Sequence, residues 1–542
     1  MPGSFTNPPY TPQNEVYTLM GIELSNNYQD TYLFDSISAQ TSFFTGKANE
    51  SVDHYTNVTP FKISDGFILL PNTIEHFNSY NYLMMKNTDM YSNKWYYAFI
   101  TSCEMVNPGV TRINFELDVI QTYQFNWNLH QCFIERCHEL TDSPGSNILD
   151  EGLELGEYII NDAKQTDKFD DYTICVACTM NSTLVDTTGG YFNGQYSGLN
   201  IISFDSASKV NDFISSATKA NKLDGIVAIF QMPSNFVRSK SNSPSTSSAA
   251  DDVYTYNVTS LTLDGYTPKN KKLLTYPYKF LHVTNFMGNS ADYHYEWFSS
   301  RPLYPTTNPR QVKFEIRCSM EINPTVKIIP TNYNGMDGTS IGTLNNVDYG
   351  LTLSGFPQCS WVSDTYKAWV AQQGTVSAFG MDFSGVDLGY MSQGLGVLGS
   401  ALSLNVGGVA SGILGIAQTM AKQNATKSLP PQAHGENANG ALFQFGLKDF
   451  GFQDMSIRQS YARAIDGYFD MFGYSHKRTE SPMFYLNNRP FWNYIKTQGI
   501  LISGNFNNDV ARKLESIFNN GVRFWHGDYI GNYSLNNAPQ GG

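Results

Sequence analysis

The chain has 542 residues, of which 41% are hydrophobic, 14% aromatic and only 15% charged, and its formal net charge is −13. A chain of this length is too long for one hydrophobic core, so we expect about three or four domains. The aromatic content favours strands, because aromatic side chains fit a pleated sheet. The negative charge argues against a nucleic-acid-binding protein, which would neutralise phosphates with Lys and Arg.

Strands dominate the N-terminal half of the prediction. Residues 110–121 alternate between apolar and polar side chains, a period of two that indicates a half-buried strand. The apolar face of this strand consists of Ile113, Phe115, Leu117 and Val119. Residues 172–180 read as a second strand, and residues 205–232 as a helix that leads into a buried strand at 226–230.

Two loops and another strand follow. The Ser-rich stretch from Arg238 to Asp252 is typical of an exposed loop, and the only tight basic cluster, at 269–272, indicates a loop tip. Residues 311–322 give the clearest alternation in the chain. Its apolar face consists of Val312, Phe314, Ile316, Cys318, Met320 and Ile322. We therefore expect a strand there with one buried and one solvated face.

Helices are few in the prediction. One begins at Ser363, a residue suited to cap a helix N-terminus. Another lies in the stretch 507–521, with Asn508 as its N-cap and Gly521 as its C-terminal stop. It lies between predicted strands at 499–506 and 521–530.

No catalytic, cofactor-binding or metal-binding residues are predicted. Cys175 and Cys178 have the spacing of half a zinc site, but a closed structural site needs four ligands. Both lie in an apolar segment, where free cysteine acts as a small hydrophobic residue. The seven cysteines show no disulfide framework, and the N-terminus has no signal-peptide pattern, so we expect folding in a cytoplasm. The chain contains none of the common hydrolase, nucleotide-binding or metalloprotease motifs, although two distant carboxylates of a glycosidase would escape detection.

An uncharged run between Asp387 and Lys422 is the most distinctive feature of the sequence. Its 23 residues from Leu395 to Ala417 would span about 35 Å as a helix, and a bilayer core is about 30 Å thick. Glycines weaken a solitary helix in water, but in lipid they allow helices to approach closely. The pair at Gly408 and Gly412 has the G-x-x-x-G spacing of such contacts.

A run of this composition has three possible interpretations. A buried core helix would seldom contain so many glycines, and a permanent transmembrane anchor does not suit the polar, β-rich remainder. The favoured interpretation is a conditional membrane segment that is hidden inside an oligomer before release, because exposed apolar surface of this size would aggregate. The predicted membrane-active residues are Leu388, Leu395, Val397, Leu398, Leu402, Leu404, Val406, Val409, Ile413, Leu414, Ile416 and Met420. The predicted loop glycines are Gly394, Gly396, Gly399, Gly407, Gly408, Gly412 and Gly415.

Four segments carry a resemblance to a known family. They are NYLMMKN…WYYAFI (81–100), RINFELDVIQTYQFNWNLHQCFIERCHEL (112–140), FPQCSWVSDTYKAWVAQQ (356–373) and the C-terminal stretch 487–537. Together they resemble the distal tail tube, or tail knob, proteins of small short-tailed phages of Gram-positive bacteria. The resemblance is weakest over 160–300.

The resemblance implies a mainly β fold with minor α content, built from tandem tail-tube-like β-barrels. The domain prediction is an N-terminal barrel at 1–160, an inserted α+β knob domain at 161–300, the first part of a second barrel at 301–378, a Gly-rich hydrophobic loop at 379–440, and a C-terminal part that completes the second barrel at 441–542.

The resemblance further implies a non-enzymatic virion component at the distal phage tail. It implies a homohexameric tube whose lumen is plugged by hydrophobic loops, which later insert into the host membrane and form a channel for genome ejection. The implied partners are a lower collar or connector protein, other tail-tip or appendage proteins, host membrane lipid, and genomic DNA that passes without specific binding. Six copies would carry a charge of −78 (6 × −13), which would repel DNA where it lines the bore.

Two other functions remained open. A receptor-binding or cell-wall-degrading tail component would use the inserted domain, with Tyr191 and Tyr196 stacking on sugars. A pore-forming toxin would use the same hydrophobic loop to kill cells without a virion.

Overall fold

The computed structural model is mainly β with minor α content, as predicted. It describes residues 13–48, 53–58, 62–87, 94–139, 142, 145–166, 168–169, 172–180, 190–192, 195–197, 200–204, 206–222, 225–237, 245–246, 252–286, 288–300, 302–303, 310–319, 325–331, 333, 350–353, 358–360, 377–378, 381–382, 433–436, 442–445 and 449–538. The chain divides into two compact units. Unit 1 comprises 1–154, 268–273 and 460–542, and unit 2 comprises 155–267 and 274–459.

Unit 1 contains a six-stranded antiparallel sheet with the strand order β3-β1-β5-β6-β7-β4. Its strands are β1 (Asn14–Met20), β3 (His54–Thr56), β4 (Phe67–Leu70), β5 (Tyr80–Asn87), β6 (Tyr96–Asn107) and β7 (Val110–Leu117). Short helical segments accompany it: α1 (Ile37–Gly46), η1 (Ile63–Asp65) and α2 (Ile74–Phe77). One face of the sheet buries an apolar cluster that includes Val16, Ile68, Leu83 and Ile113.

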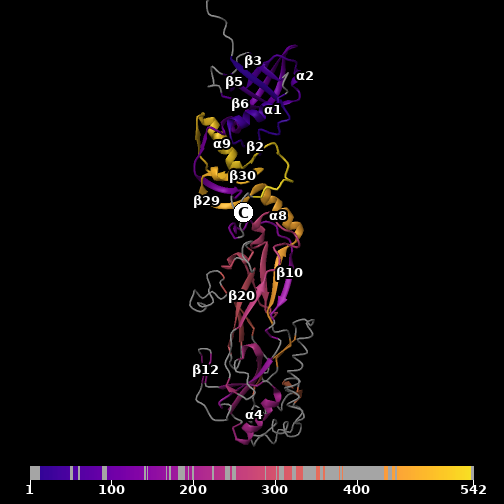
Figure 1. Cartoon of the computed structure of the whole chain (residues 1–542), viewed down its shortest axis with the longest axis vertical. Coiled ribbons are helices and arrows are strands. Elements are labelled where there is room, and N and C mark those ends of the chain that lie inside the picture. The colour runs from indigo at the N-terminus through magenta and orange to yellow at the C-terminus, as the bar shows by residue number, and fades with distance from the viewer. Residues whose placement is uncertain are drawn as a thin grey trace, which may run out of the picture. The chain divides into compact units, whose positions relative to one another are not determined.

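The second sheet of unit 1 joins the two ends of the chain, and Figure 1 shows indigo and yellow elements within this unit. Its order is β2-β32-β30-β9-β29, and β8 pairs separately with β31. The strands are β2 (Asp30–Tyr32), β8 (Trp127–Leu129), β9 (Cys132–Cys137), β29 (Tyr474–Glu480), β30 (Trp492–Gln498), β31 (Ile502–Gly504) and β32 (Val522–Trp525). The helices are α3 (Val119–Tyr123), α8 (Gln459–Phe472), η7 (Pro482–Tyr485) and α9 (Asn508–Asn520). Because Trp492 and Trp525 share one core with Tyr82 and Tyr97, the N- and C-terminal segments fold as one body.

Unit 2 contains two four-stranded antiparallel sheets. One has the order β10-β28-β18-β19 and the other β17-β20-β21-β22. Their strands are β10 (Tyr158–Gln165), β17 (Asp252–Asn257), β18 (Lys279–Thr284), β19 (Ser290–Tyr293), β20 (Gln311–Ser319), β21 (Thr325–Pro330), β22 (Leu351–Leu353) and β28 (Gly451–Ile457). A short helix of this unit is η5 (Tyr295–Trp297), whereas η4 (Lys271–Leu274) lies almost entirely in the 268–273 segment of unit 1. Rings of Phe314 and Phe452, one from each sheet, contact at 5.1 Å.

A third sheet of unit 2 has the order β16-β14-β11-β15-β23, and α4 packs against it. Its elements are β11 (Tyr172–Cys178), β14 (Asn200–Phe204), α4 (Ala207–Lys219), β15 (Ile226–Pro233), η3 (Ser234–Phe236), β16 (Ser245–Thr246) and β23 (Gln358–Ser360). A separate hairpin joins β12 (Gly190–Phe192) and β13 (Gln195–Ser197). The helix and the strand expected in 205–232 are thus confirmed.

Several sequence predictions can be compared with these elements. The strand expected at 311–322 is confirmed over 311–319, where Val312, Phe314 and Ile316 are buried. The predicted strand through Val119 is too long, because Asp118 caps the start of α3 with its carboxylate. The predicted N-cap Asn508 is one residue late, since the side chain of Asn507 accepts a hydrogen bond from the Val510 N–H.

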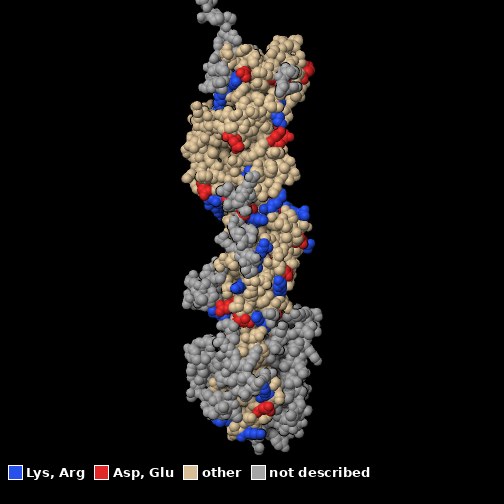
Figure 2. Space-filling model, in the orientation of Figure 1, with Lys and Arg blue, Asp and Glu red and all other residues tan. Residues whose placement is uncertain are grey.

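Cys175 and Cys178 are free and fully buried, which confirms that they pack in a core. The helix expected after Ser363 and most of the loop expected after Arg238 lie outside the described residues. Figure 2 shows few charged side chains on the face of unit 1 that it displays, in agreement with the low charged fraction of the sequence. The predicted domain boundaries stay predictions.

Candidate functional site

All predicted membrane-active residues and loop glycines lie outside the described residues. Within the part of the chain that the structure describes, no helix is long and apolar enough to cross a membrane. The same part of the chain has no group of three or more His, Cys, Asp and Glu that could hold a metal ion. The structure therefore shows how the chain is anchored in the segments that precede and follow the uncharged run.

Two short antiparallel hairpins flank the uncharged run in sequence. Before it, β24 (Ser377–Ala378) pairs with β25 (Met381–Asp382). After it, β26 (Ala433–Glu436) pairs with β27 (Leu442–Phe445). Residues 383–432 between these hairpins include every predicted membrane-active position. The backbone on both sides of the run thus pairs locally.

The C-terminal side of the run returns to a firmly packed strand. Asp449 accepts hydrogen bonds from the Thr166 hydroxyl and, at 2.7 Å, from the N–H of Phe450. The Phe450 ring lies 5.7 Å from the ring of Phe169 and is fully buried. The next residue, Gly451, has no space for a side chain, since a Cβ there would lie 2.4 Å from the Phe286 ring. These contacts fix the start of β28.

The N-terminal side is held more lightly. The three-residue strand β22 pairs with β21, and Asn285 donates a hydrogen bond of 3.0 Å to the carbonyl of Thr352. Further along, β23 adds to the edge of the third sheet through its pairing with residues 228–230 of β15. A three-residue edge strand contributes few backbone hydrogen bonds and opens more readily than a central strand. The two ends of the run therefore differ in how strongly they are anchored.

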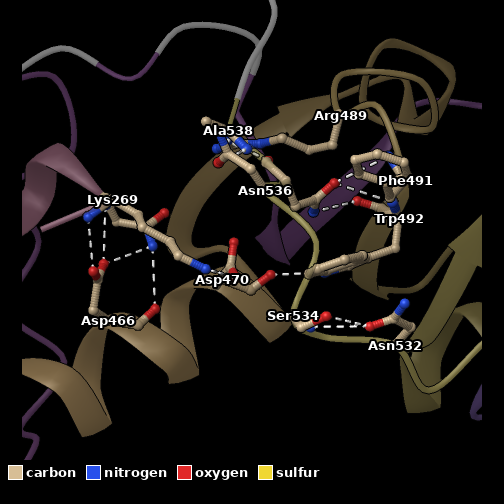
Figure 3. A network of polar contacts seen from close by, with 12 residues as sticks. Lys269, Asp466, Asp470, Arg489, Phe491, Trp492, Asn532, Ser534, Asn536 and Ala538 are labelled. Carbon is tan, nitrogen blue, oxygen red and sulfur yellow. Dashed lines mark hydrogen bonds and ion pairs between the residues drawn. The ribbon is translucent and has the colours of Figure 1, made fainter.

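The basic cluster at 269–272 is not the exposed loop tip that the sequence predicted. It lies in unit 1 against α8, as Figure 3 shows. The Lys269 N–H donates to Asp466 at 2.7 Å, its ammonium lies 3.3 Å from Asp470, and Asn270 donates to Asp466 at 2.8 Å. Carboxylates on α8 therefore hold this segment in place. The short sequence between Pro268 and Leu273 has no periodic pattern from which this contact could be predicted.

Lys272 is the most buried member of the cluster, with 2% of its side chain exposed. Its ammonium pairs with Glu151, and Arg136 pairs with the same carboxylate. Burial alone would raise the pKa of Glu151, but the two cations together hold that pKa below its usual value. The carboxylate of Glu151 stays ionised and forms ion pairs with both Arg136 and Lys272.

The same polar network continues into the C-terminal segment of unit 1. The side chain of Asn537 accepts hydrogen bonds of 3.1 Å from the N–H groups of Phe491 and Trp492, and the Trp492 indole donates to the carbonyl of Asp470 at 2.7 Å. His138 accepts from the Tyr494 N–H at 2.8 Å and donates to the Asp470 carbonyl at 3.0 Å. Burial lowers the pKa of His138, so its ring is neutral. These bonds serve to position backbone.

Buried carboxyl groups with raised pKa values occur in both units. Burial raises the pKa of Asp118 to about 6, against hydrogen bonds from two backbone N–H groups of α3. Burial also raises the pKa of Glu296 to about 7 and lowers that of neighbouring His294 to about 4. Among the described residues, neither carboxyl belongs to a group of three or more His, Cys, Asp and Glu that could hold a metal ion. The prediction that the chain is not an enzyme stays a prediction.

Comparison with known proteins identifies the family. Residues 237–538 match the C-terminal domain of the tail knob protein gp9 of Bacillus phage phi29, and residues 11–128 match the N-terminus of caudoviral major tail proteins. The tail knob proteins gp9 of Bacillus phages B103 and phi29 are 26% and 25% identical to the chain, over 96% of the chain and 98% of each relative.

The solved structure of the bacteriophage C1 tail knob protein gp12 shares the fold. Its TM-score is 0.64 at 16% sequence identity, and the match covers 97% of this chain and 100% of that one. The fold, the N-terminal match and the gp9-type C-terminal region, which spans more than half of the chain, agree with one another. The chain belongs to the phi29 gp9 family of phage tail knob proteins.

Proposed function

We propose that this tail knob protein, a structural component of the virion, forms a homohexameric conduit for genome ejection whose hydrophobic loops plug the lumen and then enter the host membrane. The observation that carries the proposal is an uncharged, glycine-rich run of 23 residues, Leu395 to Ala417, in a member of this family. Its length matches a bilayer core of about 30 Å.

The composition of the chain supports the conduit. A formal charge of −13 on each subunit disfavours adhesion of DNA, since phosphates are bound chiefly by basic side chains. A bore with acidic or neutral walls would let the genome pass without binding it. The conduit would be joined to a collar or connector protein on one side and to tail-tip or appendage proteins on the other.

The unequal anchoring of the run supports its release. The start of β28 is fixed by Asp449 and Phe450, whereas β23 is a three-residue edge strand. Extraction of the run into lipid would therefore proceed from the side of β23, while β28 remains in its sheet. In lipid, the glycines would allow the loops of six subunits to pack closely.

Deletion of residues 388–421 tests the proposal, because both flanking hairpins remain in the chain. We expect the variant to assemble six-fold rings in electron micrographs and to be incorporated into virions, but to fail in genome delivery and in dye release from vesicles. As a matched control, deletion of the Ser-rich stretch 239–250 should leave delivery intact. Normal delivery by the first variant would refute the membrane role, and rings of another symmetry would refute the hexamer.

A further inference from the structure

An ion pair inside unit 2 has unusual surroundings. Lys279 lies on β18 and Asp454 on β28, and Leu281 is the residue directly opposite Asp454 in the register. Lys279 and Asp454 are therefore diagonal neighbours on the same face of the sheet. The Lys279 Nζ lies 2.6 Å from Oδ2 of Asp454, and the two side chains are 0% and 1% exposed.

The groups around this pair are mostly aromatic. Tyr295, itself buried, donates a hydrogen bond of 2.9 Å to the second carboxylate oxygen, Oδ1 of Asp454. Nζ of Lys279 donates a second bond of 3.1 Å to the carbonyl of Thr262. Phe452 lies two residues before Asp454 on β28, and its ring stacks on that of Tyr256. The pair thus sits in a dry environment of low dielectric constant.

A further carboxylate reaches the same face. Asp162 on β10 lies directly opposite Asp454 in the register, so both side chains project to one side of the sheet. Asp162 accepts a hydrogen bond of 3.4 Å from the hydroxyl of Tyr256 and pairs with the half-buried Lys164. Its side chain is 26% exposed.

The surroundings favour neutral forms of both partners. Burial lowers the pKa of Lys279, although Asp454 opposes this effect. Burial likewise raises the pKa of Asp454, against the opposing charge of Lys279, and the nearby charge of Asp162 raises it further. A neutral amine and a neutral carboxylic acid are the forms that condense to an amide.

We propose that Lys279 and Asp454 join in an intramolecular isopeptide bond. The lone pair of Nζ attacks Cγ of the protonated Asp454, and the hydrogen bond from Tyr295 stabilises the negative charge that develops on Oδ1. One proton passes from the attacking nitrogen to the hydroxyl at Oδ2, which leaves as water. The C–N bond forms, the C–O bond breaks, and no oxidant or reductant is needed. The fold holds the amine of Lys279 next to the carboxyl group of Asp454, and this fixed proximity accelerates the reaction between them.

A second buried pair in the protein provides an internal contrast. Lys272 and Glu151 are as buried as Lys279 and Asp454, with 2% of each side chain exposed. However, Arg136 also pairs with Glu151, and the Ser475 N–H donates to it at 3.0 Å. These partners lower the pKa of Glu151, so it remains an ionised carboxylate that does not condense. Burial of a lysine beside a carboxylate is therefore not sufficient for an isopeptide bond to form. In the Lys272–Glu151 pair, the second cation, Arg136, keeps the carboxylate ionised and so prevents the reaction.

The bond would join β18 to β28 covalently. It would close a ring through residues 279–454, a ring that contains the whole uncharged run. The sheet would then stay intact on both sides of the run under mechanical load. The inference rests on the geometry of unit 2 and does not require the proposed membrane role.

Mass spectrometry of the purified full-length protein under denaturing conditions tests the proposal. We expect an intact mass lower by one water than the sequence requires, and a branched peptide that joins Lys279 to Asp454. Lys279→Gln should restore the full mass, Tyr295→Phe should slow the loss of water after synthesis, and Lys272→Gln should leave the loss unchanged. These masses can be read even if a variant folds poorly. A wild-type protein with its full sequence mass, or a loss that persists in Lys279→Gln, would overturn the inference.

Discussion

Substitution of Gly473 by alanine tests the account of how unit 1 is assembled. Gly473 follows α8 with φ +66°, and its N–H donates to the carbonyl of Phe469 at 2.8 Å. A side chain in this left-handed conformation costs about 1–2 kcal/mol. A Cβ at this position would also lie only 2.1 Å from the backbone carbonyl oxygen of Cys137.

That contact adds a second cost, because Cys137 lies in β9, which is paired on both edges with β29 and β30 and therefore cannot move freely. Overpacking of this kind costs about 1–3 kcal/mol. The total expected loss for Gly473→Ala is therefore about 2–5 kcal/mol. Gly499 is a matched control, with φ +65° and no atom within 4 Å of its Cβ position. Gly499→Ala should lose only the conformational part, about 1–2 kcal/mol.

Urea denaturation of the two variants and the wild type, followed by the fluorescence of the buried tryptophans Trp492 and Trp525, measures the difference. We expect the midpoint of Gly473→Ala to lie clearly below that of Gly499→Ala. Equal midpoints for the two variants would refute the close packing of the α8 terminus against β9.

Three further predictions follow from single positions. The folded pKa of Glu296, about 7, exceeds its ordinary 4.5, so the folded protein keeps a proton that the unfolded chain releases, and this group alone should lower stability by about 3 kcal/mol as pH rises from 4.5 to 7. Because the lowered pKa of His294 acts in the opposite direction over this range, the difference between wild type and Glu296→Gln in thermal scans at pH 4.5 and pH 7 measures the contribution of Glu296. Lys272→Met leaves Glu151 with one cation and should cost about 3 kcal/mol in chemical denaturation, whereas Lys271→Met should cost less than about 1; equal costs would contradict the buried pair. Leu404→Asp should abolish vesicle dye release, since a carboxylate in mid-bilayer costs about 3 kcal/mol per subunit, whereas Leu404→Ile should retain it.

Local patterns predicted the elements whose burial follows a simple period. The alternation in 311–322 located β20 and its buried face because one side of that strand meets the core and the other meets water. The helix at 508–520 was equally visible, and its N-cap was misplaced by one residue because two asparagines, Asn507 and Asn508, stand side by side. Cys175 and Cys178 were correctly placed in a core because their neighbours are apolar.

Contacts between residues far apart in the chain could not be predicted from local sequence patterns. Lys272 resembles any solvated lysine of a loop, and only its approach to Glu151 and Arg136, distant in the chain, buries it. The parallel pairing of β2 with β32, which places Asp30 beside Arg523, has no local signature either. The isopeptide candidate depends likewise on the register of three strands, β10, β28 and β18, which alternation alone does not fix.

The uncharged run could be recognised from composition alone, because charged side chains are common in water-exposed segments and rare in segments that enter lipid. The match to a family of tail knob proteins then suggested a function for it. Its extent was readable from two flanking acidic and two flanking basic residues, Asp382, Asp387, Lys422 and Lys427.

Labelling from within the membrane tests the central claim most directly. Target cells or vesicles would carry a lipid with a photoreactive group in its acyl chain, virions would be added, and the sites of attachment would be mapped by peptide mass spectrometry. The account predicts labelling within residues 388–421 after genome release begins, and none in free virions mixed with unlabelled lipid. Genome delivery with labels confined to other proteins, or to other parts of this chain, would contradict it.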